Sequence, residues 1–271
     1  MMMTENELDE LLEFMKDLAL RAGALAEGAR ADHLEEDINT KGEVRDIVTA
    51  ADKMVEEFII KAITKRYPDH GIFGEESGKR NMESPYCWII DPIDGTTSYA
   101  HNAPTFSTSI GLYYENKPLA GAVYAPRFKE LYYARKGKGA YCNGVKLSVT
   151  DHSELEKSVV TTGFSCLRAG WKDNNLPFFC AIAPIARDIR KYGSAALDCC
   201  WLAAGKQDAF WELNLQLYDY AAGILILTEA GGICTDLFGG DDLAKKGLLA
   251  ANKPLHKILL PFFKDYKATG K

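Results

Sequence analysis

The chain has 271 residues, of which 47% are hydrophobic, and this is enough apolar material for one large domain or for two closely packed halves. Its 32 basic and 38 acidic residues give a formal net charge of −6, and the lack of a long basic run argues against nucleic acid as the main partner. The sequence has no apolar stretch of membrane-spanning length, no signal-peptide pattern and no Cys-x-x-Cys pair among its seven cysteines. We therefore expect a cytoplasmic protein with reduced thiols and no membrane contact.

The first part of the chain predicts two helices separated by a turn. Apolar residues recur at helical spacing from about residue 5 to about residue 31. The polar segment 39–44 predicts a turn or a hairpin tip. A second helix is expected to begin near Thr49, which can cap it together with Asp52, and to end at Pro68. Its expected apolar face consists of Met54, Phe58, Ile59, Ala62 and Ile63.

Short apolar runs then predict a set of strands. The run 87–90 is continuously apolar, which fits a strand buried on both faces, whereas 79–85 is polar and predicts a loop. Turn signals at 115–118 and at Asn143-Gly144 predict two hairpins. The strands expected in this half are 72–73, 87–90, 106–114, 119–124, 131–134 and 140–142.

The second half of the chain alternates between strand and helix signals. The expected strands are 158–162, 209–211, 233–235 and 248–251, and the expected helices lie near 181–191, 194–204, 220–230 and 254–265. The sequence contains no internal repeat and no low-complexity linker. We therefore predict layered α and β structure in one compact domain over 1–271, with halves of about 1–150 and 151–271.

Five acidic residues lie at boundaries between predicted elements rather than on solvated faces: Glu75, Glu76, Asp91, Asp94 and Asp219. Asp91 and Asp94 close an apolar strand, and two such carboxylates repel each other unless a cation or hydrogen-bond donors compensate. Carboxylate oxygens are suitable ligands for Mg²⁺. The turn 95–97 (GTT) opens a helix, and its free N–H groups suit a phosphate. Together these features indicate metal-assisted phosphoryl chemistry.

Three of these acidic residues also have simpler interpretations. Taken alone, Glu75-Glu76 is typical of a surface loop, and Asp219 is typical of an ordinary helix N-cap. The pair formed by Asp91 and Asp94 is harder to explain without a cation.

The same residues fall in motifs that occur in a known family in the same order. The motifs are 46–52 (DIVTAAD), 74–77 (GEES), 88–97 (WIIDPIDGTT), 193–198 (GSAALD) and 217–223 (LYDYAAG) followed by 229–232 (EAGG). The chain resembles the inositol monophosphatase family of Mg²⁺-dependent, lithium-sensitive phosphatases, and is most similar to bacterial-type inositol-1-monophosphatases. The resemblance extends over nearly the whole chain. It implies an α+β fold, a layered α-β-α-β-α sandwich of the inositol monophosphatase/fructose-1,6-bisphosphatase type.

The resemblance also implies a metal site with two to three Mg²⁺ ions. The implied ligands are Glu75, Asp91, the backbone carbonyl of Ile93, Asp94 and Asp219. Asp91 matches a ligand shared by two ions. A third ion is held more loosely by Glu75, with Asp46 and Asp52 near it.

Catalytic and substrate-binding roles follow from the same resemblance. Glu75 and Thr96 match the pair that orients the attacking water, and Asp52 is counted with them as catalytic. The backbone N–H groups of Gly95 and Thr96 match the donors to the phosphate. Contacts to the alcohol portion of the substrate match Gly193, Ser194, Ala195 and Glu212. A metal-activated water needs no covalent enzyme intermediate, so the cysteines and histidines need no catalytic role.

The substrate itself stays open at this point. A small phosphorylated metabolite is expected, and an inositol monophosphate is the first hypothesis because Glu212 can accept hydrogen bonds from hydroxyl groups. Histidinol phosphate, fructose 1,6-bisphosphate, adenosine 3′,5′-bisphosphate or NADP are alternatives with the same chemistry, and segment 164–177 has no clear substrate signature. A non-catalytic binding or regulatory protein is the hypothesis from a different class. The family also implies a homodimer.

Overall fold

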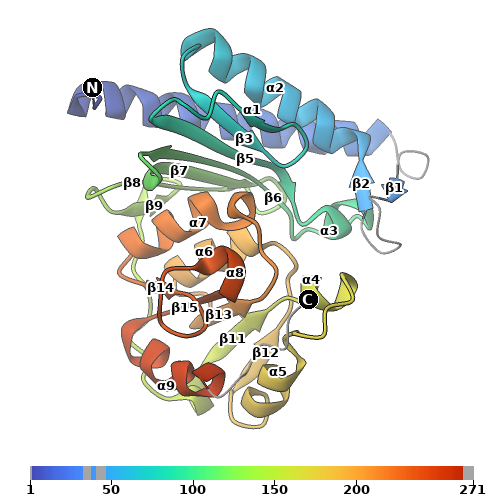
Figure 1. Ribbon diagram of the computed structural model, residues 1–271, viewed down its shortest axis with the longest axis vertical. Coiled ribbons are helices and arrows are strands. Elements are labelled where there is room, and N and C mark those ends of the chain that lie inside the picture. Colours follow the sequence, from blue (N-terminus) through green and yellow to red (C-terminus); the bar gives the residue numbers. More distant parts are fainter. Residues whose placement is uncertain (1, 33–37, 41–46, 265–271) are drawn as a thin grey trace.

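The computed structural model describes residues 2–32, 38–40 and 47–264, so Asp46 and segment 41–44 lie outside the described residues. Helices and sheets alternate in layers in Figure 1: long helices, a large sheet, middle helices, a smaller sheet and a last layer of helices. This arrangement confirms the predicted α+β fold with α-β-α-β-α layering. Among the described helices, none combines the length and apolar composition needed to cross a bilayer. The cytoplasmic location stays a prediction.

The first layer consists of α1 (Glu5–Asp32) and α2 (Ala50–Arg66), with a small hairpin of β1 (Ile38–Thr40) and β2 (Ile47–Thr49) beside them. The apolar face of α1 repeats at helical spacing, with buried Leu8, Leu11, Met15, Leu18 and Ala22. Both predicted helices are therefore confirmed. The predicted face of α2 was wrong at one position, since Met54 is 41% exposed and Val55 is buried in its place.

The large sheet has eight strands among the described residues, in the order β10-β9-β8-β7-β6-β5-β3-β4. Its strands are β3 (Gly71–Gly74), β4 (Gly78–Arg80), β5 (Tyr86–Asp94), β6 (Ser107–Tyr114), β7 (Lys117–Ala125), β8 (Glu130–Arg135), β9 (Ala140–Cys142) and β10 (Val145–Lys146). Glu115 and Asn116 both have positive φ, as the tight hairpin between β6 and β7 requires. The predicted loop 79–85 was wrong at its start, because residues 78–80 pair with β3.

The middle layer consists of α6 (Ala195–Ala203) and α7 (Leu217–Glu229). Glycines on the large sheet let α7 approach closely: a Cβ on Gly121 would lie 3.1 Å from the Cα of Ala222, and one on Gly111 would lie 3.2 Å from the Cβ of Ala221. The other face of this layer packs on the smaller sheet, so that buried residues of both sheets join one apolar cluster around the two helices. The middle helices thus connect the two halves of the chain.

The smaller sheet has five strands among the described residues, in the order β12-β11-β13-β15-β14. Its elements and neighbours are η1 (Leu155–Lys157), β11 (Val159–Thr162), α4 (Ser165–Arg168), α5 (Leu176–Ile182), β12 (Asp188–Arg190), β13 (Ala209–Glu212), β14 (Ile233–Thr235), α8 (Leu243–Lys246), β15 (Leu248–Ala251) and α9 (Lys253–Lys264). The predicted helix 181–191 was wrong. Pro184 disfavours helical backbone before it and cannot continue a helix, and the following residues form β12 beside β11.

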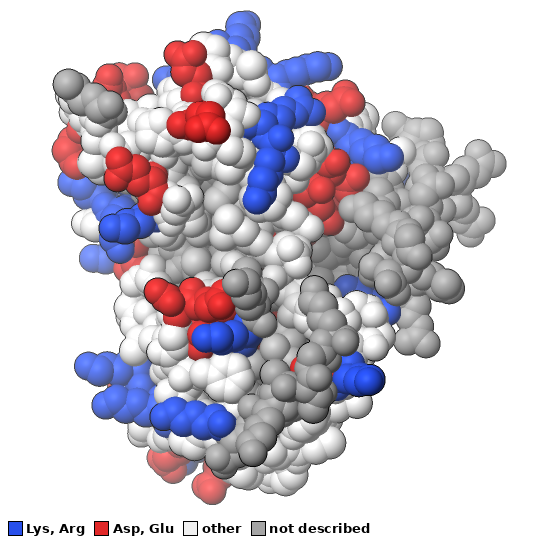
Figure 2. Space-filling model, viewed as in Figure 1, with Lys and Arg blue, Asp and Glu red and all other residues white. Residues whose placement is uncertain are grey.

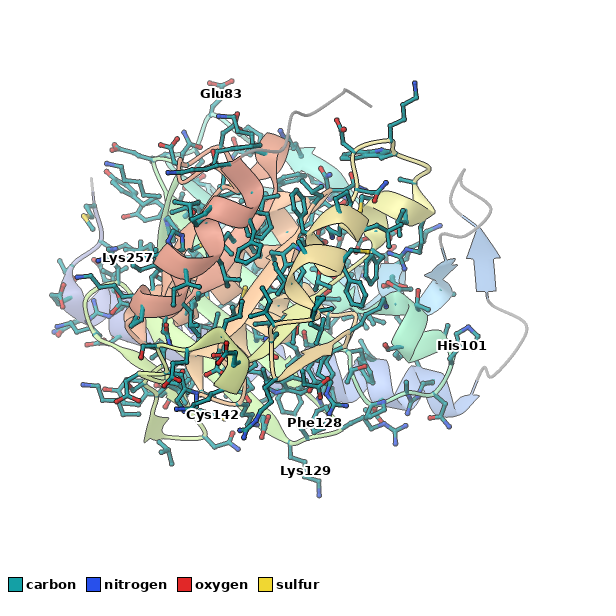
Figure 3. All side chains as sticks on the ribbon, turned by 90° about the horizontal axis from the view of Figure 1, so that it is seen from below. Glu83, His101, Phe128, Lys129, Cys142 and Lys257 are labelled. Carbon is teal, nitrogen blue, oxygen red and sulfur yellow. The ribbon has the colours of Figure 1, made fainter. Side chains whose placement is uncertain are left out.

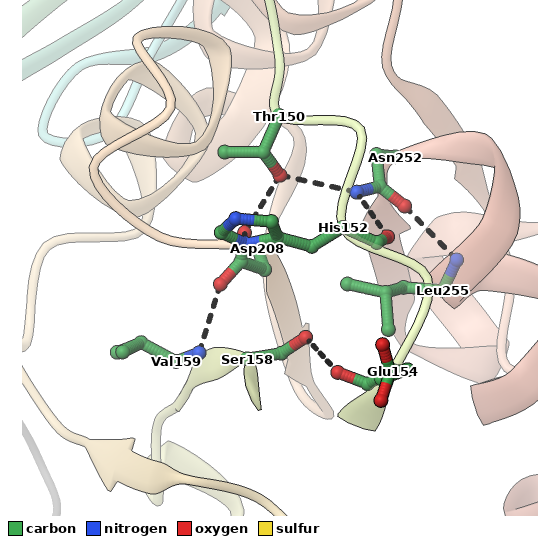
Figure 4. Close-up of polar contacts among 8 residues, drawn as sticks. All are labelled: Thr150, His152, Glu154, Ser158, Val159, Asp208, Asn252 and Leu255. Atoms are coloured by element: carbon green, nitrogen blue, oxygen red, sulfur yellow. Dashed lines mark hydrogen bonds and ion pairs between the residues drawn. The ribbon is translucent and has the colours of Figure 1, made fainter. Parts of the chain in front are cut away.

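One buried carboxylate fixes the start of this sheet (Figure 4). Asp208 accepts hydrogen bonds from the Thr150 hydroxyl at 2.6 Å, from the Val159 N–H at 2.8 Å and from His152 Nδ1 at 2.9 Å. Asn252 donates in turn to the carbonyl of His152 at 3.0 Å. His152 therefore has a structural partner, as expected for a histidine without a catalytic role.

The charged residues on the visible face are mixed. Figure 2 shows Lys and Arg side chains interspersed with Asp and Glu over the upper and lower helix layers, with no continuous basic field on that face. A duplex or single-stranded nucleic acid needs such a field for its phosphates.

Candidate active site

The aspartates of β5 point into one pocket because the strand contains a bulge. Asp91 pairs with Ser109 and Asp94 with Ser107, so three residues of β5 advance against two of β6. In a regular strand, residues three apart face opposite sides of the sheet. The extra residue changes this alternation, and both carboxylates line the pocket.

Glu75 reaches the same pocket from the neighbouring strand. β3 runs parallel to β5, and the backbone N–H of Glu75 extends the ladder by donating to the carbonyl of Ile90 at 3.1 Å. Because Gly74 pairs with Ile90, the next residue on each strand comes level with the other, which places Glu75 beside Asp91. The loop after it is held by Glu56 of α2, whose carboxylate accepts hydrogen bonds from the N–H groups of Glu76 and Ser77.

Asp219 enters from the first turn of α7. Its carboxylate accepts a hydrogen bond from the backbone N–H of Gln216, the residue that caps the helix. It also lines the pocket. The interpretation of Asp219 as the N-cap was wrong, because Gln216 is the N-cap and Asp219 is the N3 residue that completes a capping box with it.

Asp94 is held by the N-terminus of α6. Its Oδ2 accepts from the Ser194 hydroxyl at 2.6 Å and from the Ala196 N–H at 2.7 Å, and its Oδ1 accepts from the Ala195 N–H at 3.3 Å. Helix N-termini stabilise negative charge in this way. Ser194 is completely buried and does not line the pocket, so the structure puts it behind Asp94 rather than at the predicted substrate face.

The turn after β5 depends on a glycine. Gly95 has a φ of 92°, and a Cβ there would lie 2.8 Å from the carbonyl oxygen of Thr105. The short helix α3 (Thr96–Ala100) follows, and the Thr96 hydroxyl donates to the carbonyl of Ile93 at 3.1 Å. Both Gly95 and Thr96 line the pocket, with the backbone of Ile93 beside them.

The opposite wall of the pocket comes from the second half of the chain. Glu212 of β13 is buried, and its Oε1 accepts from the Ser165 hydroxyl at 2.8 Å. Two exposed cations stand at the rim: Arg168, which donates from Nη1 to the Thr97 hydroxyl at 3.2 Å, and Lys191. Sequence reasoning missed both cations and Ser165. Lys191 lies two residues before the motif 193–198, and this proximity could have indicated that it belongs to the site. Arg168 lies in a segment without a recognisable motif.

The pocket has a volume of about 190 Å³. The predicted site residues that line it are Glu75, Asp91, Ile93, Asp94, Gly95, Thr96, Gly193, Ala195, Glu212 and Asp219. Ser194 and Asp52 do not line it; Asp52 is buried in the first turn of α2. No described histidine lines the pocket, and His101 lies at the periphery, at the end of α3 (Figure 3). The roles assigned to these residues stay predictions.

The carboxylates of the pocket raise one another's pKa. For Asp91, burial is the largest cause, and the charges of Glu75, Asp94 and Asp219 add to it. Burial raises the pKa of Asp94 to about 7, although the hydrogen bonds from Ser194, Ala196 and Ala195 oppose this. The pKa of Asp219 is raised by burial and by the charge of Asp94. A site with this much unfavourable negative charge is one that a bound cation would stabilise.

These observations fit Mg²⁺. Asp91 is 2% exposed, and its Oδ1 has no hydrogen-bond partner among the described residues, which leaves a buried oxygen open for a cation. In the described part of the chain, no three His, Cys, Asp or Glu side chains come close enough to hold an ion by themselves. Mg²⁺ commonly binds one or two carboxylates and completes its shell with water and substrate phosphate oxygens. The arrangement therefore suits an open site that water and a phosphate would complete.

Comparison with known proteins agrees with the geometry. Residues 7–268 match the inositol monophosphatase family. An inositol-1-monophosphatase of Synechocystis sp. is 38% identical over 94% of this chain and 88% of its own length. A fructose-1,6-bisphosphatase/inositol-1-monophosphatase of Aquifex aeolicus is 37% identical over 96% of this chain and 97% of its own length. The solved structure of the extragenic suppressor protein suhB from Bartonella henselae has a TM-score of 0.89 and 35% identity, covering 95% of this chain and 100% of that one.

Proposed function

Because this chain belongs to the inositol monophosphatase family and is a phosphoric monoester hydrolase, we propose that it converts an inositol monophosphate and water into inositol and inorganic phosphate. The observation that carries the proposal is one pocket with a cluster of acidic side chains on one wall and Glu212 on the other. The first wall suits metal and phosphate, and the second can accept hydrogen bonds from the hydroxyl groups of a polyol. The non-catalytic hypothesis is set aside because the matched family and relatives such as that of Synechocystis sp. are named as phosphatases, although other relatives, such as that of Pasteurella multocida, are named Nus factor SuhB.

The family depends on Mg²⁺ and is typically sensitive to lithium. We propose two to three ions in this chain: Glu75, Asp91 and the carbonyl of Ile93 would hold one, and Asp91, Asp94 and Asp219 would hold another. Water and phosphate oxygens would complete each set of ligands, since the described side chains alone are not close enough to hold an ion. Bound Mg²⁺ supplies a coordinated water of lowered pKa and positive charge beside the phosphate oxygens. Asp52 is proposed to act on this site from a distance, through its charge, which contributes to the raised pKa of Asp91.

The side chains around the ions would orient the reactants. Glu75 accepts hydrogen bonds and the Thr96 hydroxyl can donate or accept, so the two can hold an attacking water in line with the phosphorus atom. The N–H groups of Gly95 and Thr96 would donate to the phosphate oxygens, which holds the phosphoryl group for displacement. The attacking water would lose a proton as the new P–O bond forms, and the leaving alcohol oxygen would take up a proton from water as the old P–O bond breaks. No group of the enzyme becomes covalently attached.

Glu212 is proposed to bind the alcohol portion together with the backbone at Gly193 and Ala195. Burial raises the pKa of Glu212, and the hydrogen bonds from Ser165 and the charges of Arg168 and Lys191 oppose that rise. The carboxyl oxygens of Glu212 can accept hydrogen bonds from vicinal hydroxyl groups. The position of Ser194 behind Asp94 makes it a support for the metal site in this proposal.

The experiment that tests the substrate is phosphate release measured with Mg²⁺ and with EDTA. The panel contains inositol 1-phosphate, histidinol phosphate, fructose 1,6-bisphosphate, adenosine 3′,5′-bisphosphate and NADP. We expect a Mg²⁺-dependent preference for inositol 1-phosphate in kcat/KM. A higher kcat/KM on another compound would leave the proposed mechanism unchanged but would make that compound the substrate of the pocket. Equal release with EDTA would contradict the metal-dependent mechanism itself.

A second candidate substrate is a sugar bisphosphate, and the two rim cations favour it. Arg168 and Lys191 can pair with a second phosphate group, and the Aquifex aeolicus relative is named for fructose 1,6-bisphosphate as well as for inositol phosphate. Replacing both cations by Ala separates the candidates. A bisphosphate substrate would lose affinity about tenfold, while inositol 1-phosphate would change little.

The homodimer that the family implies is also a proposal for this chain. Light scattering on the purified protein tests it directly, since a dimer has twice the 30.0 kDa mass of the chain.

A further inference from the structure

Glu56 is a buried carboxylate that neither the motifs nor the proposed chemistry uses. It lies on the inner face of α2 and is 1% exposed. A buried carboxylate is unfavourable unless hydrogen bonds or charges satisfy it. The exposed Glu57 beside it provides a natural comparison, because it has the same side chain on the same helix.

Both oxygens of Glu56 bind the backbone of the loop that carries Glu75. Oε2 accepts from the N–H of Glu76 at 2.9 Å, and Oε1 accepts from the N–H of Ser77 at 2.7 Å. Hydrogen bonds to a charged acceptor are stronger than those between neutral groups. Glu56 therefore fixes the two residues that directly follow Glu75.

A glycine in the sequence, Gly74, leaves room for the carboxylate of Glu56. A Cβ on Gly74 would lie 2.6 Å from the carboxyl carbon of Glu56, so only glycine lets the carboxylate lie against the strand end. On its other side, Glu75 is fixed by β3 and by its own N–H, which donates to Ile90 at 3.1 Å. The backbone at Glu75 is thus held from both directions, by β5 and by α2.

We propose that Glu56 is a positioning residue of the metal site, which sets the affinity for Mg²⁺ by holding Glu75 toward Asp91. The inference rests on the proposed function, in which Glu75 and Asp91 bind Mg²⁺. Groups that orient metal ligands without touching the metal commonly change metal affinity or activity 10- to 100-fold when they are replaced. α2 would then act on the metal site through Glu56 as well as through the charge of Asp52, and neither carboxylate lines the pocket.

The test is Mg²⁺ binding to the metal-free protein, measured by isothermal titration calorimetry without substrate. Glu56→Gln keeps the size of the side chain but replaces one acceptor by an N–H₂ group, which cannot accept from a backbone N–H. We expect its Mg²⁺ dissociation constant to rise about 10- to 100-fold, with turnover largely restored at high Mg²⁺. Glu57→Gln should bind Mg²⁺ like the wild type.

The possible results are distinct. Wild-type affinity in Glu56→Gln would overturn the inference and leave Glu56 as a structural tie only, even if the variant melts at a lower temperature. A wild-type protein that binds no Mg²⁺ would instead overturn the proposed function. If Glu56→Gln does not fold, Glu56→Asp carries the test, because it keeps the charge with a shorter reach. Several-fold weaker binding in that variant supports the proposal, and unchanged binding overturns it.

Discussion

Asp94 lies both in the proposed metal site and at the joint between the two halves of the chain. Its carboxylate lines the pocket from β5 and accepts hydrogen bonds from Ser194, Ala195 and Ala196 at the start of α6. In the proposed function the charge of Asp94 serves to bind a cation, whereas its shape and hydrogen bonds join β5 to α6. An isosteric change separates these two contributions.

Asp94→Asn should fold and lose function. With its amide oxygen in the place of Oδ2, Asn can still accept from the Ser194 hydroxyl and from the Ala196 N–H, and only the longer bond from the Ala195 N–H to Oδ1 is lost, so the joint is kept. Mg²⁺ affinity and turnover should each fall more than about 100-fold, because a direct ligand matters at least as much as its supporting groups. Circular dichroism, calorimetric titration and phosphate release check the three parts. Mg²⁺-dependent turnover at the wild-type level would contradict the assignment of Asp94 as a ligand.

The raised pKa of Asp94 predicts how Mg²⁺ stabilisation depends on pH. Burial raises it from 3.8 to about 7 without metal, so between these values the folded state binds more protons than the unfolded state. The metal-free protein therefore loses stability as pH rises through this window. Mg²⁺ replaces those protons, so the rise in Tm caused by Mg²⁺ should be larger at pH 8 than at pH 5.5. Calorimetry with EDTA or Mg²⁺ at both pH values measures it, and an equal or smaller rise at pH 8 would contradict the prediction.

At the scale of elements, the close packing of α7 on the large sheet positions Asp219. Gly111 and Gly121 face Ala221 and Ala222 at distances that leave no room for a larger side chain. The helix begins only two residues before Asp219, so a shift of the helix moves this carboxylate relative to β5. A change in the packing between these glycines and α7 should therefore also change the affinity for Mg²⁺.

Gly121→Val should destabilise the protein and weaken Mg²⁺ binding together. A Cβ there already lies 3.1 Å from Ala222, and the added methyl groups would push α7 outward at a cost of about 1–3 kcal/mol. Urea unfolding and calorimetric titration measure the two effects. Gly28→Ala is a suitable control, since its Cβ on α1 would meet nothing within 4 Å and should be neutral or slightly stabilising. Unchanged Mg²⁺ affinity in Gly121→Val would show that α7 does not position Asp219.

Elements with a strong local pattern could be predicted from the sequence, and those determined by distant contacts could not. The helices α1 and α9 and the central strands were predicted because their apolar spacing is regular. The helix predicted over 181–191 was wrong. The composition of this segment favours helix, but Pro184 and the pairing with β11 determine its structure. The prediction that Met54 is buried was wrong because the spacing of apolar residues alone does not tell which side of α2 faces the sheet.

Within the site, too, residues in a local motif could be predicted and contacts between distant segments could not. The acidic residues could be predicted because each one ends or begins an element in a recognisable motif. The contact between Glu56 and the loop of Glu75 joins residues 20 and 21 positions apart, and Arg168 meets Thr97 across 71 positions. Such contacts exist only after the sheets and helices have packed, and no local pattern indicates them.

At the scale of the whole molecule, the pocket and the core both extend across the two halves. Glu75, Asp91 and Asp94 come from the first half, and Glu212 and Asp219 come from the second. The apolar cluster around α6 and α7 likewise contains residues from the large sheet and the smaller sheet. The large sheet of the first half packs against α6 and α7, which belong to the second half. Neither half can therefore bury its apolar surface without the other.

We therefore predict that the chain unfolds as a single domain. The calorimetric and van't Hoff enthalpies of thermal unfolding should agree, and Mg²⁺ should shift the whole transition to higher temperature because its ligands belong to both halves. A fragment of residues 1–150 should lack a cooperative transition, since removal of α7 would expose the apolar face of the large sheet that it covers. Two separate transitions, of which Mg²⁺ shifts only one, would instead show two domains that fold independently and meet at the active site.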